Sequence, residues 1–273
     1  MNSALAPSSC PPLDDALLLS GRKALITGAS LGIGRAIARL FAKRGAAVAL
    51  HHSRNADAAL GYPDAGRILT DELCASGAEA IAVDVDLADL VAAAQIMSAV
   101  RWAWDRLDIL VLCASIQVRQ PLAAVDANTL AMQRRINFDA TFELLQAVLP
   151  SMAERRFGRI ISIGSVNQAR PHAELTIYAA LKAAQHNLIQ GVAQQYAANG
   201  ITANTISPGL IATPRNEWRR RDADEWVAIQ RDANPMHRAG MPEEVAQIAG
   251  LLAAPAGAFI TGADIAVDGG ARL

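Results

Sequence analysis

From Lys23 onward, short runs of apolar and β-branched residues alternate with longer segments in which apolar residues recur at helical spacing. Short apolar strands separated by amphipathic helices are typical of parallel βαβ units. The pattern therefore predicts a single α/β domain built on a doubly wound parallel sheet, with helices on both faces and ligands at the carboxyl ends of the strands. About seven strands are predicted, at residues 24–27, 47–51, 80–84, 109–113, 159–162, 202–206 and 264–267.

The beginning of the chain departs from this pattern. Residues 1–16 hold three prolines among serine and alanine and are predicted to form a flexible arm, with residues 17–273 as the domain. The apolar run at residues 16–19 has no basic segment before it and is far too short to cross a bilayer. Neither a signal peptide nor a membrane anchor is expected.

Composition and charge narrow the class of protein. Hydrophobic residues make up 52% of the chain and charged residues 19%, which suits a well-buried core. The formal net charge of -1 gives no indication of a nucleic-acid or membrane partner. Cys10, Cys74 and Cys113 show no metal-ligand spacing and are predicted to be free thiols of a cytoplasmic protein. No metal site is expected.

Tyr178 and Lys182 form a Tyr-x-x-x-Lys pair inside a long segment with helical spacing. Residues four apart share one helix face, so the phenol and the ammonium can point into one site. A nearby cation stabilises the phenolate and lowers the pKa of a tyrosine towards neutral pH, where general acid/base catalysis is most effective. Such pairs are common on helices, so the other motifs of the chain decide its interpretation.

A glycine-rich turn follows the first predicted strand, at Thr27-Gly28-Ala29-Ser30-Leu31-Gly32-Ile33-Gly34. It leads into an apolar helix predicted over residues 35–43. Glycines allow the backbone to approach a pyrophosphate closely, and the helix N-terminus offers unpaired N–H groups. A βα turn without a ligand is the alternative, but the position directly after the first strand favours a dinucleotide.

The end of the second strand indicates which dinucleotide is preferred. An acidic residue there would hold the 2′-hydroxyl of NAD, but the strand ends Leu50-His51-His52-Ser53-Arg54, without a carboxylate. Arg54 can neutralise a 2′-phosphate and Ser53 can hydrogen-bond it. NADP(H) is therefore the predicted cofactor, with NAD(H) as the alternative. We predict that His51 and His52 are loop residues rather than metal ligands, and that residues 55–66 form an extra loop.

Further motifs join these in a fixed order: Arg135-Ile136-Asn137-Phe138, Ile163-Gly164-Ser165-Val166, Pro208-Gly209 and Val267-Asp268-Gly269-Gly270. Together with the glycine-rich turn and the Tyr178 pair, they resemble the short-chain dehydrogenase/reductase family from about Leu18 to the C-terminus. The resemblance implies a Rossmann-type fold and hydride transfer between a nicotinamide and a small-molecule alcohol or ketone. It also implies a homo-oligomer, a tetramer or a dimer, built with the closing strand.

The resemblance implies four catalytic residues, namely Asn137, Ser165, Tyr178 and Lys182. Ser165 would donate a hydrogen bond to the substrate oxygen, and Tyr178 would be the acid/base. Lys182 would lower the pKa of Tyr178 and hold the nicotinamide ribose, and Asn137 would anchor a water that passes the proton towards solvent. A turn serine, a helix asparagine and a surface lysine are the alternative readings, which the joint register of all four disfavours.

The expected cofactor contacts lie at the carboxyl ends of the strands. Asp84 and Val85 are the expected adenine-contacting pair, and the segment from Pro208 to Thr213 is expected on the nicotinamide side. The full expected set is Gly28, Ser30, Leu31, Gly32, Ile33, Gly34, Ser53, Arg54, Asp84, Val85, Ala114, Tyr178, Lys182, Pro208, Gly209, Ile211 and Thr213.

Two departures from the family pattern stand out. Leu112-Cys113-Ala114-Ser115 replaces the usual Asn-Asn-Ala-Gly after the fourth strand, so the bonds that an asparagine would make must pass to other groups or water. Cys113 is interpreted as a small buried hydrophobe rather than a reactive thiol. Leu31 stands where NADP-preferring members often carry arginine or lysine.

Substrate specificity is expected from residues 115–121, 166–176 and a helical lid at about residues 213–234. Asn167, Gln168 and His172 beside Ser165 favour a hydroxylated substrate, such as a sugar, sugar acid or polyol. Arg119, Arg170 and Arg215 lie on the presumed rim, whereas the run of arginines at residues 219–221 is interpreted as a solvated helix face.

Three other functions are weighed against this oxidoreductase. A 3-oxoacyl-carrier-protein-type ketoreductase would suit the arginines beside the cleft. A non-catalytic, NADPH-binding regulatory protein would keep the fold without turnover. A serine hydrolase is excluded because no Gly-x-Ser-x-Gly elbow surrounds Ser165.

Overall fold

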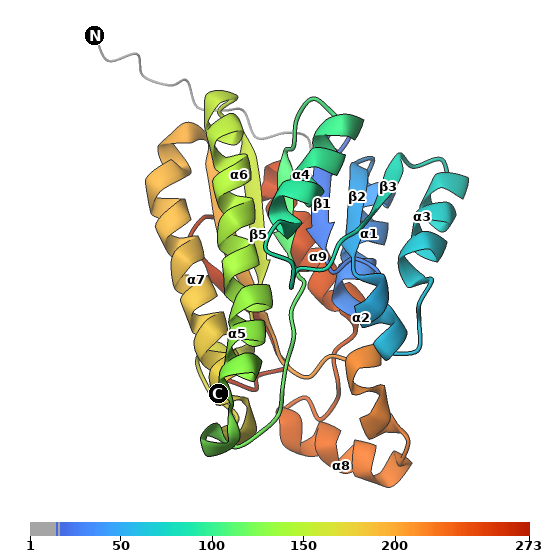
Figure 1. Ribbon diagram of the computed structural model, residues 1–273, viewed down its shortest axis with the longest axis vertical. Helices are drawn as coiled ribbons and strands as arrows, with labels where there is room; N and C mark the ends of the chain where they lie inside the picture. Colours follow the sequence, from blue (N-terminus) through green and yellow to red (C-terminus); the bar gives the residue numbers. More distant parts are fainter. Residues whose placement is uncertain (1–14, 16) are drawn as a thin grey trace.

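A seven-stranded sheet runs through the middle of the computed structural model, which describes Asp15 and residues 17–273 (Figure 1). Apart from Asp15, the arm predicted at residues 1–16 lies outside the described residues. The strands are β1 (Lys23–Thr27), β2 (Ala47–His52), β3 (Ala80–Asp84), β4 (Ile109–Leu112), β5 (Gly158–Ile163), β6 (Ile201–Pro208) and β7 (Asp264–Val267). The predicted strands are confirmed, and their ends differ from the prediction by two residues at most.

All neighbouring strands pair in parallel, in the order β3-β2-β1-β4-β5-β6-β7. The chain builds outward from β1 to β3 and then returns to place β4 on the other side of β1. Connections on the two sides therefore diverge at the carboxyl ends of β1 and β4. In a doubly wound sheet, this switch point is where ligands bind.

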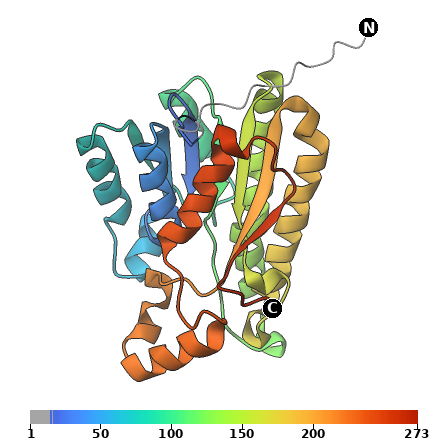
Figure 2. The same cartoon turned by 180° about the vertical axis from the view of Figure 1, so that it is seen from behind.

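Helices cover both faces of the sheet, as the two opposite views show (Figure 1, Figure 2). Successive strand residues point to opposite faces, so Ile26 belongs to one hydrophobic cluster and Leu25 to the other. The first cluster is covered by α1 (Gly32–Lys43), α3 (Ala65–Ala75) and α9 (Pro242–Ala253). The second is covered by α4 (Ala92–Ala103), α6 (Ala140–Glu154) and α7 (Thr176–Tyr196).

The remaining elements lie in the connections. They are α2 (Arg54–Ala59), α5 (Ala127–Arg134), α8 (Ala223–Ala233), the π-helical turn η2 (Arg135–Asp139), and the 3-10 helices η1 (Leu122–Ala124), η3 (Val166–Gln168), η4 (Ala173–Leu175), η5 (Ala197–Asn199), η6 (Pro214–Arg220) and η7 (Pro255–Gly257). Figure 1 shows α8 beyond the carboxyl ends of the strands, at the lower end of the molecule. Within the described part of the chain, no helix has the length and apolar character needed to cross a bilayer.

Two predictions about the second strand and the segment after it were wrong. His51 and His52 are buried in the last two positions of β2 rather than in a loop, because β2 pairs on both sides, with β1 and with β3. Part of the loop predicted at residues 55–66 is the helix α2. Ser53 caps this helix by accepting a hydrogen bond from the Ala56 N–H group, a local signal that the sequence interpretation missed.

Candidate active site

A cavity of about 880 Å³ lies at the switch point, within the usual size of small-molecule sites. Its walls come from the glycine-rich turn, the end of β2, the loops after β4 and β5, and the segment formed by η6 and α8. Ser53 after β2 and Ser165 after β5 both line it. Since β1 and β4 lie between these two strands, the cavity crosses the middle of the sheet edge.

The glycine-rich turn forms one wall and fits a pyrophosphate. Gly28 has a φ of 65°, and a Cβ there would lie 2.9 Å from the Ala114 Cα atom, so only glycine suits this position. The helix α1 begins at Gly32, its N-cap residue Leu31 offers no side-chain acceptor, and its first turn holds no acid. The N–H groups at this helix end therefore remain available to an anionic group in the cavity.

Tyr178 and Lys182 lie one turn apart on α7, as their spacing predicts. Tyr178 lines the cavity, and Lys182 is buried beneath it, with its Nζ atom 5.9 Å from the centre of the tyrosine ring. The Lys182 ammonium donates hydrogen bonds to the Ile163 carbonyl (2.8 Å) and to Gln185 Oε1 (2.9 Å). Burial lowers the pKa of Lys182 to about 8.

The pKa of Tyr178 reflects opposing effects. Burial raises the pKa of this phenol, while the charge of Arg215 and the hydroxyls of Ser165 and Ser115 act to lower it. Arg215 thus has an electrostatic influence on Tyr178 that the sequence interpretation did not name. The two positions are 37 residues apart in the chain, so no local motif connects them.

Ser165 is buried at the end of β5, and its Oγ atom accepts hydrogen bonds from the N–H group and the side-chain amide of Asn167, both at 3.1 Å. With both acceptor positions used, the hydroxyl hydrogen remains free to be donated. Tyr178 lines the same cavity, so this hydrogen is available to a substrate oxygen held between the two side chains. Asn167 and His172 line the cavity, whereas Gln168 turns away and donates to Asp264 (3.1 Å).

Asn137 is fully buried in the π-helical turn that joins α5 to α6. Its side chain bonds the backbone of Ile116 twice, at 2.9 Å each, and so fixes the loop after β4. Single π-helical turns occur often at functional sites. Because the side chain is engaged with this loop, a relay water would have to be held by the main-chain carbonyl of Asn137 or by spare positions on its amide.

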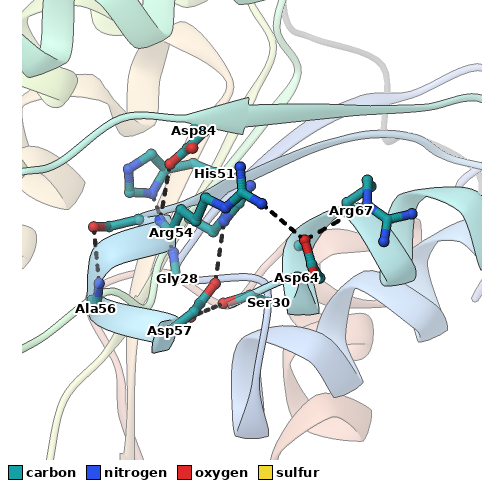
Figure 3. Close-up of polar contacts among 12 residues, drawn as sticks. Gly28, Ser30, His51, Arg54, Ala56, Asp57, Asp64, Arg67 and Asp84 are labelled. Carbon is teal, nitrogen blue, oxygen red and sulfur yellow. Dashed lines mark hydrogen bonds and ion pairs between the residues drawn. The ribbon is translucent and has the colours of Figure 1, made fainter. Parts of the chain in front are cut away.

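The two residues that follow β2, Ser53 and Arg54, differ in whether they line the cavity. Ser53 lines the cavity, but Arg54 lies outside the lining, 63% exposed, and pairs with Asp64 at 3.1 Å. Figure 3 shows the Arg54 side chain directed to Asp64. Arg54 would have to leave Asp64 to reach a 2′-phosphate in the cavity.

A buried polar network lies under this end of the cavity, and the sequence analysis missed it. The Asp57 carboxylate accepts a hydrogen bond from the Ser30 hydroxyl at 2.7 Å (Figure 3), and its other oxygen lies 3.2 Å from His52 Nδ1. His51 Nδ1 accepts from the Gly28 N–H group at 3.3 Å, and its Nε2 lies 3.0 Å from the Val85 carbonyl. The His51 ring therefore connects the glycine-rich turn to β2 and to Val85, the residue after β3.

The expected adenine pair does not line the cavity. The Asp84 carboxylate accepts from the Arg54 N–H group at 2.9 Å, and Val85 packs against the core, whereas Asp86 and Leu87 line the cavity. An acid followed by an apolar residue occurs twice here, as Asp84-Val85 and as Asp86-Leu87, and β3 ends at Asp84. The second pair therefore emerges from the sheet, two residues later than predicted.

Cys113 lines the cavity at the end of β4, and burial raises the pKa of its thiol to about 11. The thiol is therefore neutral near pH 7, in accord with its interpretation as a small apolar residue. The backbone at this departure from the family pattern is held by Thr27, whose Oγ1 atom accepts from the N–H groups of Cys113 (2.9 Å) and Ala114 (3.1 Å). Thr27 thus joins the ends of β1 and β4.

The remaining expected residues divide between the lining and the region behind it. The cavity lining includes Gly28, Ser30, Leu31, Gly32, Ile33, Gly34, Ala114, Pro208, Gly209, Ile211 and Thr213. Arg119 and Arg215 also line the cavity, but Arg170 does not, and donates to the Ala271 carbonyl at 3.1 Å. The reading of residues 219–221 as a solvated face was wrong for Arg219, which faces the cavity. No cluster of three or more metal-ligating side chains occurs among Asp15 and residues 17–273.

Comparison with known proteins identifies the family. The protein-family model described as enoyl-(acyl carrier protein) reductase matches residues 28–272. Cis-4-hydroxycyclohexanecarboxylate dehydrogenase of Sinomonas cyclohexanicum is 36% identical over 252 residues, which are 91% of this chain and 96% of the relative. The 3-oxoacyl-[acyl-carrier-protein] reductase of Vibrio cholerae serotype O1 is 32% identical over 252 residues, 92% of this chain and 98% of that protein.

Comparison with solved structures indicates the same family. A 3-oxoacyl (acyl-carrier-protein) reductase from Agrobacterium tumefaciens C58 with NADP bound has a TM-score of 0.89 and 39% identity, covering 97% of this chain and 100% of that one. A short chain dehydrogenase from Burkholderia cenocepacia J2315 in complex with NADP has a TM-score of 0.82 and 33% identity, covering 93% and 99%. The chain therefore belongs to the short-chain dehydrogenase/reductase family, and it is an oxidoreductase that acts on CH–OH groups.

Proposed function

We propose that this protein is an NADP(H)-preferring dehydrogenase/reductase that interconverts a secondary alcohol and a ketone, with Asn137, Ser165, Tyr178 and Lys182 as its catalytic residues. The observation that carries the proposal is that Ser165 and Tyr178 both line a cavity that also receives the acid-free N-terminus of α1. A bound nicotinamide would supply or accept the hydride.

The residues of the chain would handle the proton and the developing charge. Ser165 donates its free hydrogen to the substrate oxygen, which stabilises negative charge there. Tyr178 gives a proton to that oxygen in ketone reduction and takes one from the hydroxyl in alcohol oxidation. Lys182, held by Ile163 and Gln185, places a cation behind the phenol. Asn137 holds the loop after β4 and anchors a relay water.

The cofactor preference rests on the end of β2 and on the relatives. Ser53 lines the cavity where an acid would select NAD, and Arg54 is the adjacent cation. Two of the structures that match this chain over more than nine-tenths of its length hold NADP. We place the adenine against Asp86 and Leu87, which replace the expected Asp84 and Val85.

The substrate is proposed to be a sugar, sugar acid or polyol. Asn167 and His172 give the cavity polar groups beside Ser165, which suits a hydroxylated ligand. Of these three classes, the sugar acid is supported by the relative named cis-4-hydroxycyclohexanecarboxylate dehydrogenase, because that name contains a carboxylate. A 3-oxoacyl-carrier-protein-type reductase is the second candidate, supported by the likeness to the reductase of Agrobacterium tumefaciens.

Two further features complete the proposal. The segment of η6 and α8 lies beyond the strand ends and contributes Trp218, Arg219 and Ile229 to the cavity, so it could act as a lid that excludes water. A homo-oligomer is supported by β7, which forms an edge of the sheet, and by the fully exposed Phe259 shortly before it.

The test is nicotinamide absorbance during turnover with NADPH or NADH, against a panel of ketoses, oxo acids and one 3-oxoacyl thioester. Tyr178→Phe should abolish turnover of the best substrate while NADPH binding, followed by fluorescence, stays within about twofold. Tyr196→Phe makes the same change at the other end of α7 and should keep full activity. Turnover that survives Tyr178→Phe would refute the assignment, and NADPH binding without any turnover would support a non-catalytic role.

A further inference from the structure

Arg215 brings a cation to the reaction end of the cavity. Its guanidinium donates to the Ser115 carbonyl at 2.6 Å and to the Ser115 hydroxyl at 3.2 Å. Ser115, Arg215 and Tyr178 all line the same cavity. The guanidinium is therefore held by Ser115 on the cavity that the proposed acid/base also lines.

This cation has no counter-charge in the structure. Among Asp15 and residues 17–273, no carboxylate lies within ion-pair distance of Arg215, whereas Arg119 on the same wall pairs with Glu174 at 3.2 Å. Arg219 also lines the cavity without a paired acid in the described part of the chain, and stacks on Trp218 at 5.1 Å. The acid on the α8 side of the lining, Asp232, is paired with Arg231 at 3.0 Å.

A guanidinium in this position suits a carboxylate better than it suits a neutral polar group. Its planar array of N–H groups can bind both oxygens of a carboxylate at once. The Nε atom of Arg215 makes no hydrogen bond to any residue that the structure describes, so donors remain beyond those that Ser115 uses. The unpaired Arg219 adds positive potential to the same wall.

We infer that the substrate carries a carboxylate, which Arg215 binds while the reacting alcohol or ketone lies between Ser165 and Tyr178. Because Arg215, Ser115, Ser165 and Tyr178 line one cavity, the carboxylate and the reacting carbon belong to one small molecule, a hydroxy acid or an oxo acid. This inference rests on the proposed oxidoreductase function and narrows its substrate class.

The experiment compares two acids with their neutral amides: 4-oxocyclohexanecarboxylate with 4-oxocyclohexanecarboxamide, and 4-oxopentanoate with 4-oxopentanamide. NADPH consumption is measured with the wild type, Arg215→Met, Arg215→Lys, and the control Arg221→Met on the same segment, where the arginine is exposed and outside the cavity lining. Arg215→Met should lower kcat/KM for the acids about ten- to a hundredfold more than for the amides, which lose only the influence of Arg215 on Tyr178. Arg215→Lys should recover part of the loss, and Arg221→Met should match the wild type.

Binding is measured alongside turnover, as the change in Tm that each acid and amide produces in the complex with NADP. Equal losses for acids and amides in Arg215→Met, or a loss explained by weaker NADPH binding, would overturn the inference, since Arg215 would then act only on Tyr178 or on the cofactor. Reduction of amides but not acids would overturn it and leave the proposed oxidoreductase intact. Acid binding that depends on Arg215 without any reduction would support the carboxylate site and count against the proposed reaction. No Tm shift and no turnover with either acid would overturn the inference.

Discussion

The ammonium of Lys182 lies 5.9 Å from the centre of the Tyr178 ring, yet its hydrogen bonds go to the Ile163 carbonyl and the Gln185 side chain. The lysine is therefore anchored under the site rather than attached to the phenol. Two buried groups set the acid/base chemistry together. Burial raises the pKa of Tyr178 and lowers the pKa of Lys182 to about 8.

This arrangement predicts opposite pH dependences for the two directions of the reaction. Alcohol oxidation needs the phenolate of Tyr178, and the raised pKa makes this form scarce at neutral pH. Its kcat/KM should rise with pH, by up to about tenfold per unit from pH 6 to 8. Ketone reduction needs the protonated phenol and should be flat over this range, then fall at higher pH. Initial rates in both directions check this, with circular dichroism to show that the fold persists. A flat oxidation profile would remove Tyr178 as the titrating base.

Arg54 and Asp64 make a second prediction, about cofactor choice. The exposed guanidinium is held by Asp64 at 3.1 Å and must exchange this partner for the 2′-phosphate. Arg54→Ala should weaken NADPH binding about five- to tenfold and leave NADH almost unchanged, since an exposed charge pair contributes little. Asp64→Asn should tighten NADPH binding, because it frees Arg54.

Fluorescence titration with each reduced cofactor measures these effects. Arg67→Ala serves as the control, because Arg67 is as exposed as Arg54 and also lies near Asp64, at 3.8 Å. Equal weakening of NADPH and NADH by Arg54→Ala would show that Arg54 does not read the 2′-phosphate.

The local motifs of the chain were enough to place much of this site. The glycine-rich turn, Ser165 and the Tyr178 pair each lie in a short motif of neighbouring residues, and the joint order of these motifs resembles the family, so all three were predicted, and the turn, Ser165 and Tyr178 line the cavity. Contacts between distant segments were not readable in this way. The unpaired state of Arg215 depends on which acids lie near it, and that emerges only when η6 meets the loop after β4.

The register of β3 explains why the residue pair that lines the cavity was not identified from the sequence. Asp84-Val85-Asp86-Leu87 offers two similar pairs of acid and apolar residue, and composition does not choose between them. In the folded chain, Asp84 pairs in register with His52, so the strand still continues there and the later pair reaches the cavity. The buried partnership of His52 with Asp57 likewise required the helix α2, which the sequence interpretation treated as loop.

The cysteines provide a third prediction. Cys74 is exposed on α3, whereas Cys113 is partly buried and burial raises the pKa of its thiol to about 11. The thiolate is the reactive form, so iodoacetamide at pH 7.5 should modify Cys74 and leave Cys113 unmodified for much longer. Peptide mapping by mass spectrometry measures this, with urea-unfolded protein as the control in which both react. Early modification of Cys113 would contradict its assignment as an inert apolar residue.

His51 makes the stability of the protein depend on pH. Its Nδ1 atom accepts from the Gly28 N–H group, so the neutral ring donates from Nε2 to the Val85 carbonyl, and burial lowers the pKa of His51 to about 4. An unfolded histidine titrates near pH ~6.5. Because the folded pKa is depressed, the contribution of His51 is complete above pH ~6.5 and is lost as pH falls towards the folded value.

Urea unfolding at pH 7.5 and pH 5 should therefore show a drop in the free energy of unfolding, of which about 2 kcal/mol comes from His51. His51→Gln removes the titrating group while keeping a donor and an acceptor, so its drop should be smaller by that amount. His172→Gln changes an exposed histidine and should keep the full drop. Protonation of His51 would set an Nδ1–H group against the Gly28 N–H group, and His51→Gln removes this conflict. If His51→Gln and His172→Gln lost the same stability on acidification, the drop would therefore not come from His51.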